Sequence, residues 1–178
     1  MHDVLAAARR LLETTSPRWT HLAASVPADL FALPPAPGQW SALDCLQHLV
    51  DAERSVFPVR VRALLAGQDF AAFDPDRQGT QPAARGAAPG AELAAEFAVL
   101  RVGGLALLAT LTPADLPRQA RHQELGLVSL SELVHEWAGH DLMHTVQAER
   151  ALLQPFIQGC GPWQSYFRDH VAGAGAFN

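Results

Sequence analysis

The stretch SLSELVHEWAGHDLMHTVQAERALLQ, residues 129–154, determines how the rest of the chain is arranged. Its apolar residues recur every three to four positions, which predicts one long helix. Ser129 and Ser131 are both suitable capping residues for its start, and Pro155 is expected to end it. A long helix with one apolar stripe needs partner helices, so this stretch favours a helical bundle.

His140, Asp141 and His144 interrupt the apolar stripe of this helix, with the two histidines one turn apart. Buried imidazoles need polar partners, so the pair indicates either a shared metal ion or two hydrogen-bonded core histidines. His135 and Glu136, followed by His140, look like a zinc-protease signature, but the second histidine comes one residue too late. His135 then falls on the solvent side or a partner side, which excludes the protease geometry.

Length and composition limit the class of protein. The 178 residues, of which 49% are hydrophobic, suffice for the core of a single domain covering residues 1–178. No apolar run reaches the roughly 18 residues of a membrane span, and the N-terminus does not resemble a secretory signal. We therefore expect a soluble, cytoplasmic protein with no membrane partner. The net charge of −5, without a cluster of Lys and Arg, argues against nucleic acid as a partner.

The two cysteines, Cys45 and Cys160, are far apart in the sequence and form no CxxC pattern. We expect both to be free thiols. Cys45 lies three positions before His48 in an amphipathic segment, and we interpret it as a small buried residue in preference to a nucleophile.

Helical periodicity covers most of the remaining chain, and no strand with period two is predicted. Ser41 and Asp44 form a capping box that opens a helix over 42–66, which Pro58 should bend. The other expected segments are a helical region at 2–25 that is one bent helix or two, a connector at 26–39, a helix at 89–111, an irregular linker at 116–128 and a short C-terminal helix at 163–170. We therefore predict an all-α four-helix bundle with a long loop at 67–88.

Two packing contacts are also expected. Gly103 and Gly104 weaken the middle of the helix at 89–111, which predicts a close contact at this point. The outer side of the histidine-bearing helix is apolar as well, and such a face is rarely left in water. We expect the tail and the second copy of a homodimer to share the task of covering Leu142, Val146 and Leu153.

His48 is the best candidate for a third metal ligand. It lies on the inward stripe of the helix predicted over 42–66, with Asp44 four positions before it and Asp51 three positions after it. A lone histidine at such a place is more often a core residue. The His140–His144 pair on another helix of the same bundle favours the metal interpretation.

Three segments, in this order and spacing, resemble the DinB/YfiT-like family of metal-binding proteins: WSALDCLQHLVDAER at 40–54, HQELGLVSLSELVHEW at 122–137 and HDLMHTVQ at 140–147. The resemblance covers nearly the whole chain. It implies a four-helix bundle, often a homodimer, in which His48, His140 and His144 bind one divalent metal ion per chain. Some members of that family transfer low-molecular-weight thiols such as bacillithiol or mycothiol, and others have no known activity.

Three imidazoles with an open coordination position suit catalysis, because a metal ion there can activate a water or a thiol. We expect a metal-dependent transferase that joins a small-molecule thiol to an electrophilic substrate; the thiol comes from the resemblance alone. The alternatives are a metal-dependent hydrolase and a non-catalytic, stress-related metal-binding bundle. Zn, Ni, Fe or Cu would suit the three ligands, and the sequence does not decide among them.

Several polar residues are candidates for supporting this site. We expect side chains near the histidines to orient them, namely Asp44, Asp51, Asp141 and Gln147. Asp44 has the alternative role of acting only at the helix start. Candidates for substrate contacts are His122, Asp74, Asp76 and Arg77, each of which could equally be an ordinary solvated loop residue.

Overall fold

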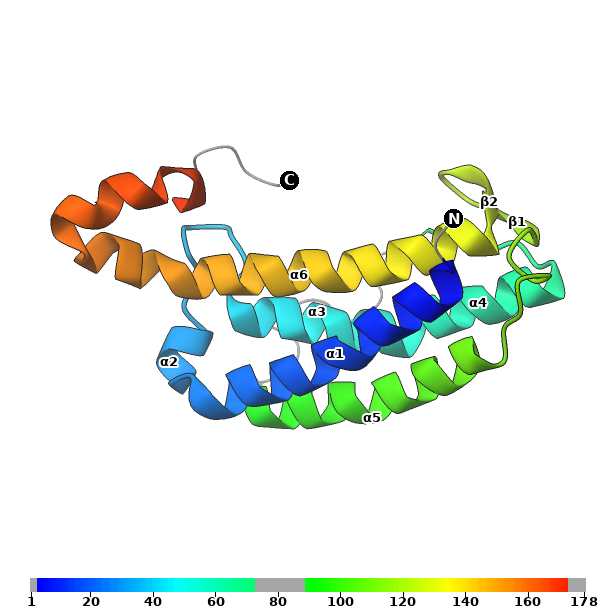
Figure 1. Ribbon diagram of the computed structural model, residues 1–178, viewed down its shortest axis with the longest axis horizontal. Helices are drawn as coiled ribbons and strands as arrows, with labels where there is room; N and C mark the ends of the chain where they lie inside the picture. The colour runs from blue at the N-terminus through cyan, green and yellow to red at the C-terminus, as the bar shows by residue number, and fades with distance from the viewer. Residues whose placement is uncertain (1–2, 73–88, 173–178) are drawn as a thin grey trace.

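The computed structural model of the protein describes residues 3–72 and 89–172. Its long helices form a bundle (Figure 1): α1 (Val4–Ser25), α3 (Ala42–Ser55) continued by α4 (Phe57–Ala66), α5 (Gly90–Ala109) and α6 (Leu130–Gly159). Helices α1 and α3 each pack against both α5 and α6, so the four occupy the corners of a bundle. The predicted four-helix bundle is confirmed.

The region before the first connector is one continuous helix, α1, although Pro17 lies inside it. Proline removes one backbone hydrogen bond, but Trp19 beyond it is fully buried, and this packing holds the helix together. Asp3 caps the start by accepting a hydrogen bond from Ala6 N at 3.2 Å. The connector that follows contains a short helix, α2 (Ala28–Phe31), whose Phe31 is buried in the core.

The helix predicted over 42–66 is divided at Val56, where the backbone has φ −112° and ψ −76°. Pro58 stands in the first turn of α4, the place in a helix where a missing N–H costs least. The break lets α4 leave the line of α3 and pack against α6 and the strand β1 (Gln119–His122).

Helix α6 continues to Gly159, so the expectation that Pro155 ends it is wrong. Ile157 beyond the proline is buried, and its packing favours retention of the last turn. The chain then forms a 3₁₀ helix, η1 (Gly161–His170), which folds back beside the end of α6 (Figure 1). Hydrogen bonds from Arg150 to Asp169 O and from Gln154 to His170 O fix this short C-terminal helix.

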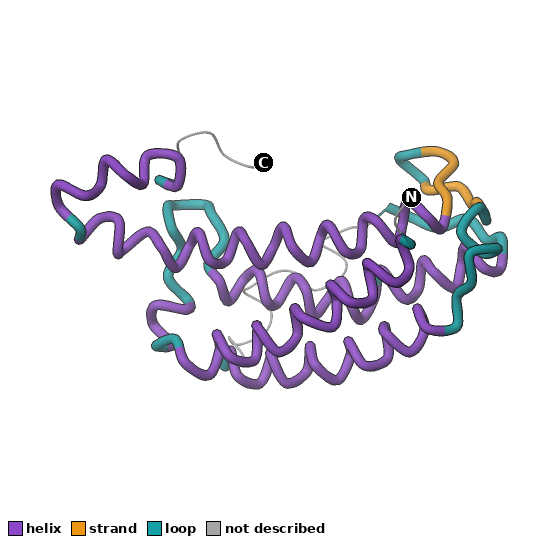
Figure 2. The backbone as a smooth tube through the Cα atoms, in the orientation of Figure 1, coloured by secondary structure: helices purple, strands orange, loops and turns teal. Residues whose placement is uncertain are grey.

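A small antiparallel hairpin replaces the irregular linker expected before α6. Strands β1 (Gln119–His122) and β2 (Gly126–Ser129) pair from Gln119 opposite Ser129 to His122 opposite Gly126, and Figure 2 shows them at one end of the bundle. Gly126 has φ +79°, which favours glycine at this turn. Each strand has only four residues, too few for a period of two to stand out in the sequence.

The outer face of α6 is only partly covered. The tail contacts the end of the helix near Gln154, and Leu153 is partly buried. Leu142 and Val146 remain 38% and 50% exposed. The tail therefore lies against the end of α6 and leaves these two residues exposed. The expectation that a second copy covers the rest of the face stays a prediction. None of the helices in the described ranges is long and apolar enough to cross a membrane.

The buried apolar residues form two clusters along the bundle. One contains Leu12, Val56 and Trp137, and the other contains Trp19 and Phe97. Buried polar residues occupy positions between the two clusters on each long helix, namely Thr15 on α1, Asp51 and Glu53 on α3, Arg101 on α5, and Asp141 and His144 on α6. The bundle therefore has a polar layer between two apolar ones, and the candidate site belongs to that layer.

Candidate metal centre

His48 lies on helix α3, whose first turn is fixed by a capping box. Ser41 Oγ accepts a hydrogen bond from Asp44 N at 3.2 Å, and Ser41 N donates to Asp44 Oδ2 at 2.9 Å, which completes the predicted capping box. Leu49 and Val50, the two residues after His48, are almost fully buried. This packing fixes the rotation of α3 about its axis and turns His48 toward α6.

Helix α6 presents His140 and His144 one turn apart. Of the two candidate caps it is Ser129 that forms the capping box, with Glu132. Trp137 is fully buried one turn before His140 and stacks on Phe57 of α4, with ring centroids 5.3 Å apart. His135 is exposed, as expected from its place on the helix.

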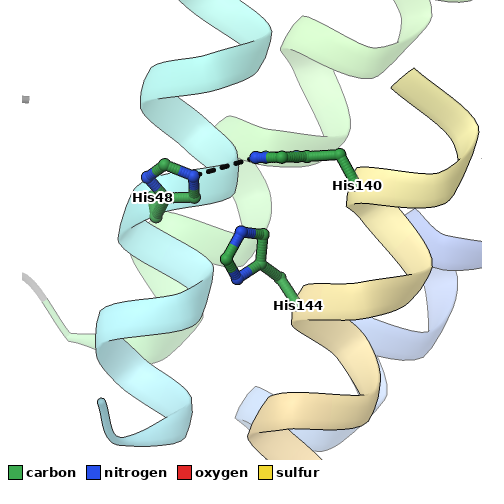
Figure 3. A group of neighbouring side chains, drawn as sticks. All are labelled: His48, His140 and His144. Carbon is green, nitrogen blue, oxygen red and sulfur yellow. Dashed lines mark hydrogen bonds between the residues drawn. The ribbon is translucent and has the colours of Figure 1, made fainter. Parts of the chain in front are cut away.

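The three histidines converge between α3 and α6, and their rings point toward one another (Figure 3). Nε2 of His48 lies 2.9 Å from Nε2 of His140. One nitrogen from each of the three rings falls in a group whose members all lie within 4.8 Å of one another. His144 is buried, and the other two rings are partly buried.

Burial keeps these imidazoles neutral. It lowers the pKa of His48 to about 4, with a further contribution from His144. Burial and the neighbouring rings lower the pKa of His140 to about 3. Burial also lowers the pKa of His144, against the opposing effects of Gln147 and Asp141. At neutral pH each ring therefore keeps a lone pair, as a metal ligand must.

Aromatic side chains pack around the three rings. Trp40, 38% exposed, stacks on His144 with centroids 5.6 Å apart and also contacts His48 at 5.0 Å. Phe57 packs edge-on against His140 at 5.1 Å. Nδ1 of His140 is buried and has no hydrogen-bond partner among the described residues. Packing against Phe57 therefore contributes to holding this ring in place.

The cluster fits a divalent metal ion. Two nitrogen ligands at about 2.0–2.1 Å from one tetrahedral ion are separated by roughly 3.3 Å. The 2.9 Å separation of His48 and His140 and the 4.8 Å limit of the whole group bracket that value. Within residues 3–72 and 89–172, no Cys, Asp or Glu joins the three histidines.

Comparison with known proteins places the chain in a family. A sequence profile of the DinB superfamily matches residues 11–148. The chain belongs to the DinB superfamily. None of the curated proteins compared with this chain matches it.

A solved structure shares the fold of this DinB superfamily protein. It is YfiT from Bacillus subtilis, described as a probable metal-dependent hydrolase with an unusual four-helix bundle topology. The TM-score is 0.73 at 17% sequence identity, and the match covers 88% of this chain and 90% of YfiT. At this level of identity the similarity establishes the common fold.

In the DinB superfamily protein, Gln147 contacts a site histidine directly. Its side-chain oxygen accepts a hydrogen bond from Nδ1 of His144 at 2.9 Å. A ring that carries its proton on Nδ1 keeps the lone pair on Nε2, the nitrogen available to the cluster. The structure therefore places Gln147 where an orienting residue was expected.

The three aspartates considered as orienting residues form hydrogen bonds outside the histidine cluster. Asp44 belongs to the capping box of α3, which agrees with its alternative role at the helix start. Asp51 is buried and accepts hydrogen bonds from Gln47 at 3.2 Å and Arg54 at 2.9 Å. Asp141 points into the bundle, where both of its carboxylate oxygens bind Arg101. Asp141 affects the site electrostatically, because its charge raises the pKa of His144.

His122 is a structural residue of the hairpin, so its candidacy for substrate contact is not supported. It is buried, and its Nδ1 accepts hydrogen bonds from the backbone N–H groups of Glu124 and Leu125 at 3.1 and 3.2 Å. Its ring packs edge-on against Phe70. The other candidates for substrate contact, Asp74, Asp76 and Arg77, lie outside the described residues.

Cys45 is fully buried, and burial raises its pKa to about 12. A thiol with so high a pKa is protonated at neutral pH and does not act as a nucleophile. Cys45 and Cys160 are both free, as expected.

Sequence reasoning missed two residues of the polar layer, Arg101 and Glu53. Arg101 is 2% exposed in the middle of α5, and Glu53 is 3% exposed on α3. An Arg and a Glu inside apolar helical stripes were the available signal, because such residues are almost never buried unless they are paired. Trp40 belongs to the segment at 40–54, but its place in the sequence does not indicate that it packs against His48 and His144.

Proposed function

We propose that this protein is a metal-dependent enzyme that activates a small nucleophile at His48, His140 and His144. The observation that carries the proposal is the convergence of three neutral imidazoles from two helices, without a carboxylate or thiolate among them in the described ranges. Three protein ligands are typical of catalytic sites, whereas structural sites are usually closed by four.

The residues around the histidines have defined tasks in this proposal. Gln147 holds His144 in one tautomer, so the lone pair of the neutral ring lies on Nε2. Trp40 and Phe57 form apolar walls that limit access of water to the rings. When bound, a divalent cation acts as a Lewis acid that lowers the pKa of a coordinated water or thiol.

The nucleophile we propose is a low-molecular-weight thiol of the bacillithiol or mycothiol type, which attacks an electrophilic carbon. Its support is the family resemblance, which includes thiol transferases. A hydrolase that activates water is the second candidate, and its support is the description of YfiT as a probable metal-dependent hydrolase. Both reactions need the same three ligands, so they differ in substrate and not in the site.

An activity screen separates the two reactions. Protein purified without a His-tag is loaded with Zn²⁺, Ni²⁺ or Fe²⁺ and given bacillithiol, mycothiol, glutathione or cysteine together with an alkylating or chloro-aromatic acceptor. A parallel panel contains esters and amides. We expect thiol to be consumed faster than in controls containing the metal alone. Cleavage of an ester or amide without thiol consumption would replace the transferase proposal by the hydrolase one.

Two histidine variants of α6 test whether the reaction depends on the cluster. His140→Ala removes a ligand, and we expect a loss of turnover larger than the roughly 10–100-fold typical of changes around a metal ligand. His135→Ala is the matched control, because His135 is an exposed histidine of the same helix. Equal turnover in the two variants would contradict the proposed site.

A further inference from the structure

The buried Arg101 makes contacts with three other helices of the bundle. It is 2% exposed, and its guanidinium lies over the ring of Phe97 at 4.7 Å. Nε and Nη2 donate to the two carboxylate oxygens of Glu53 on α3, each at 3.0 Å. Nη1 and Nη2 donate to the two oxygens of Asp141 on α6, at 3.0 and 2.8 Å.

The guanidinium also forms hydrogen bonds to α1. Nη1, which has two N–H groups for three acceptors, also lies 3.0 Å from Leu12 O and 2.9 Å from Thr15 Oγ1. The indole Nε1 of Trp137 donates to Glu53 Oε2 at 3.0 Å. All of these groups are buried, so their hydrogen bonds fix the relative positions of four helices with little freedom. We call Arg101, Glu53 and Asp141 the clamp.

The clamp holds the same two helices that carry the histidines. Glu53 follows His48 by five residues on α3, a rise of about 7.5 Å along the helix. Asp141 is the residue after His140 on α6 and points into the bundle. A planar guanidinium that binds two carboxylates through both edges tolerates little sliding or rotation of either helix. Such movements would separate His48 from the other two rings.

Gly104 shows that the chain makes room for the clamp. A Cβ at this position would overlap Glu53 Oε1 and lie 2.9 Å from the Trp137 ring. In the clamp one guanidinium faces two carboxyl groups, and burial raises the pKa of Glu53. A buried ionic group of this kind is often no more stabilising than apolar side chains of similar size, so stability alone gives weak grounds for its presence.

From this geometry we propose that Arg101 is a positioning residue for the metal site: it fixes α3 against α6 at the separation at which His48 meets His140 and His144. This inference rests on the proposed metal binding by the three histidines. It assigns Arg101 a role in the shape of the site, through Glu53 and Asp141, and no contact with metal or substrate.

The test compares Co²⁺ binding with fold stability in tag-free protein. The dissociation constant is measured by competition with a chelator, the geometry by the visible absorption of Co²⁺, and the stability by thermal unfolding of the metal-free protein. Arg101→Lys keeps the charge but loses the planar fork. We expect its Co²⁺ affinity to fall by about 10–100-fold, with a changed absorption spectrum and retained helical content.

Leu108→Ala is the matched control. Leu108 is buried on the same helix, in the apolar cluster, and truncating it should destabilise the fold without altering the clamp. We expect this variant to keep wild-type Co²⁺ affinity and spectrum. If the Co²⁺ affinity of both variants falls in proportion to their loss of thermal stability, the positioning role is wrong.

If Arg101→Lys does not fold, the neutral triple variant Arg101→Met/Glu53→Gln/Asp141→Asn leaves no unpaired buried charge and decides the question. Wild-type Co²⁺ affinity and spectrum in the folded triple variant, or in Arg101→Lys, would refute the clamp while leaving the metal site intact. A wild-type protein that binds no Co²⁺ would instead refute the three-histidine site, and the clamp's proposed role with it.

Discussion

The three histidines owe their chemical properties to burial. A folded-state pKa of about 4 for His48 and about 3 for His140 lies well below the ordinary value of 6.5. In the unfolded chain these rings bind protons that the folded chain does not, so the free energy of unfolding falls as the pH drops below about 6.5.

The first prediction concerns this dependence in the metal-free protein. The free energy of unfolding should be highest above about pH 6.5 and decrease toward pH 4. The two rings together should account for a loss on the order of 5 kcal/mol. Urea unfolding of wild type and His140→Gln at several pH values measures the effect as a difference between the two. We expect a smaller pH slope in the variant. Identical slopes would contradict the assigned pKa of His140.

Gln147 provides the second prediction at the scale of one residue. Gln147→Ala removes the acceptor for Nδ1 of His144, so the ring can adopt the wrong tautomer. Metal affinity should fall by about 10–100-fold with little change in folding. The exposed Gln158 on the same helix is the control, and Gln158→Ala should bind metal like the wild type. Equal affinities in all three proteins would show that the hydrogen bond has no role in ligand orientation.

The sequence predicted the individual ligands better than their surroundings. His48, His140 and His144 could be placed on inward stripes because helical periodicity is local. Gln147 followed from its spacing to His144. The clamp could not be predicted in this way: Arg101 is 48 residues from Glu53 and 40 from Asp141 in sequence. Only the three-dimensional packing brings these groups together.

At the scale of elements, the capping box of α3 and the bend near Pro58 were predictable, whereas the effect of Pro155 was not. The starts of α3 and α6 follow from Ser41 with Asp44 and from Ser129 with Glu132, which are interactions within one turn. Pro155 was expected to end α6, yet the helix continues because later residues are packed. The cost of one lost hydrogen bond can be outweighed by burial of apolar surface, which the local sequence does not reveal.

The glycine pair of α5 gives the third prediction. Gly104 faces Glu53 and Trp137 so closely that a methyl group would overlap them, whereas a methyl group at Gly103 would meet nothing within 4 Å. Gly104→Ala should therefore lose about 1–3 kcal/mol of stability through overpacking. Gly103→Ala should gain up to about 1 kcal/mol from its better helix propensity. Chemical denaturation measures both, and equal effects of the two substitutions would contradict the close packing at Gly104.

At the scale of the whole molecule, the bundle places its polar layer between two apolar clusters, and the outer face of α6 remains partly open. Leu142, Met143 and Val146 are 38%, 49% and 50% exposed. Because such a face is unfavourable in water, we propose that a second copy of the chain covers it. The periodicity of α6 predicts that this face is apolar, but the sequence of one chain does not predict what covers it.

The fourth prediction is a homodimer that uses this face. Light scattering should show a dimer for the wild type at high micromolar concentration. Val146→Glu places a charge in the proposed interface and should shift the protein toward the monomer. Val99→Glu is the control, because Val99 is an exposed valine on α5. A monomeric wild type, or equal behaviour of both variants, would rule out this interface.

Metal content tests the central claim most directly. Tag-free wild type, His48→Ala, His140→Ala, His144→Ala and the control His135→Ala are loaded with excess divalent metal, desalted and measured by elemental analysis, with circular dichroism to confirm folding. We predict about one ion per chain in the wild type and in His135→Ala, as for a single three-histidine site, and loss of the ion in each of the other three. Folded wild type that retains no metal, or His48→Ala that retains all of it, would contradict a centre shared by α3 and α6.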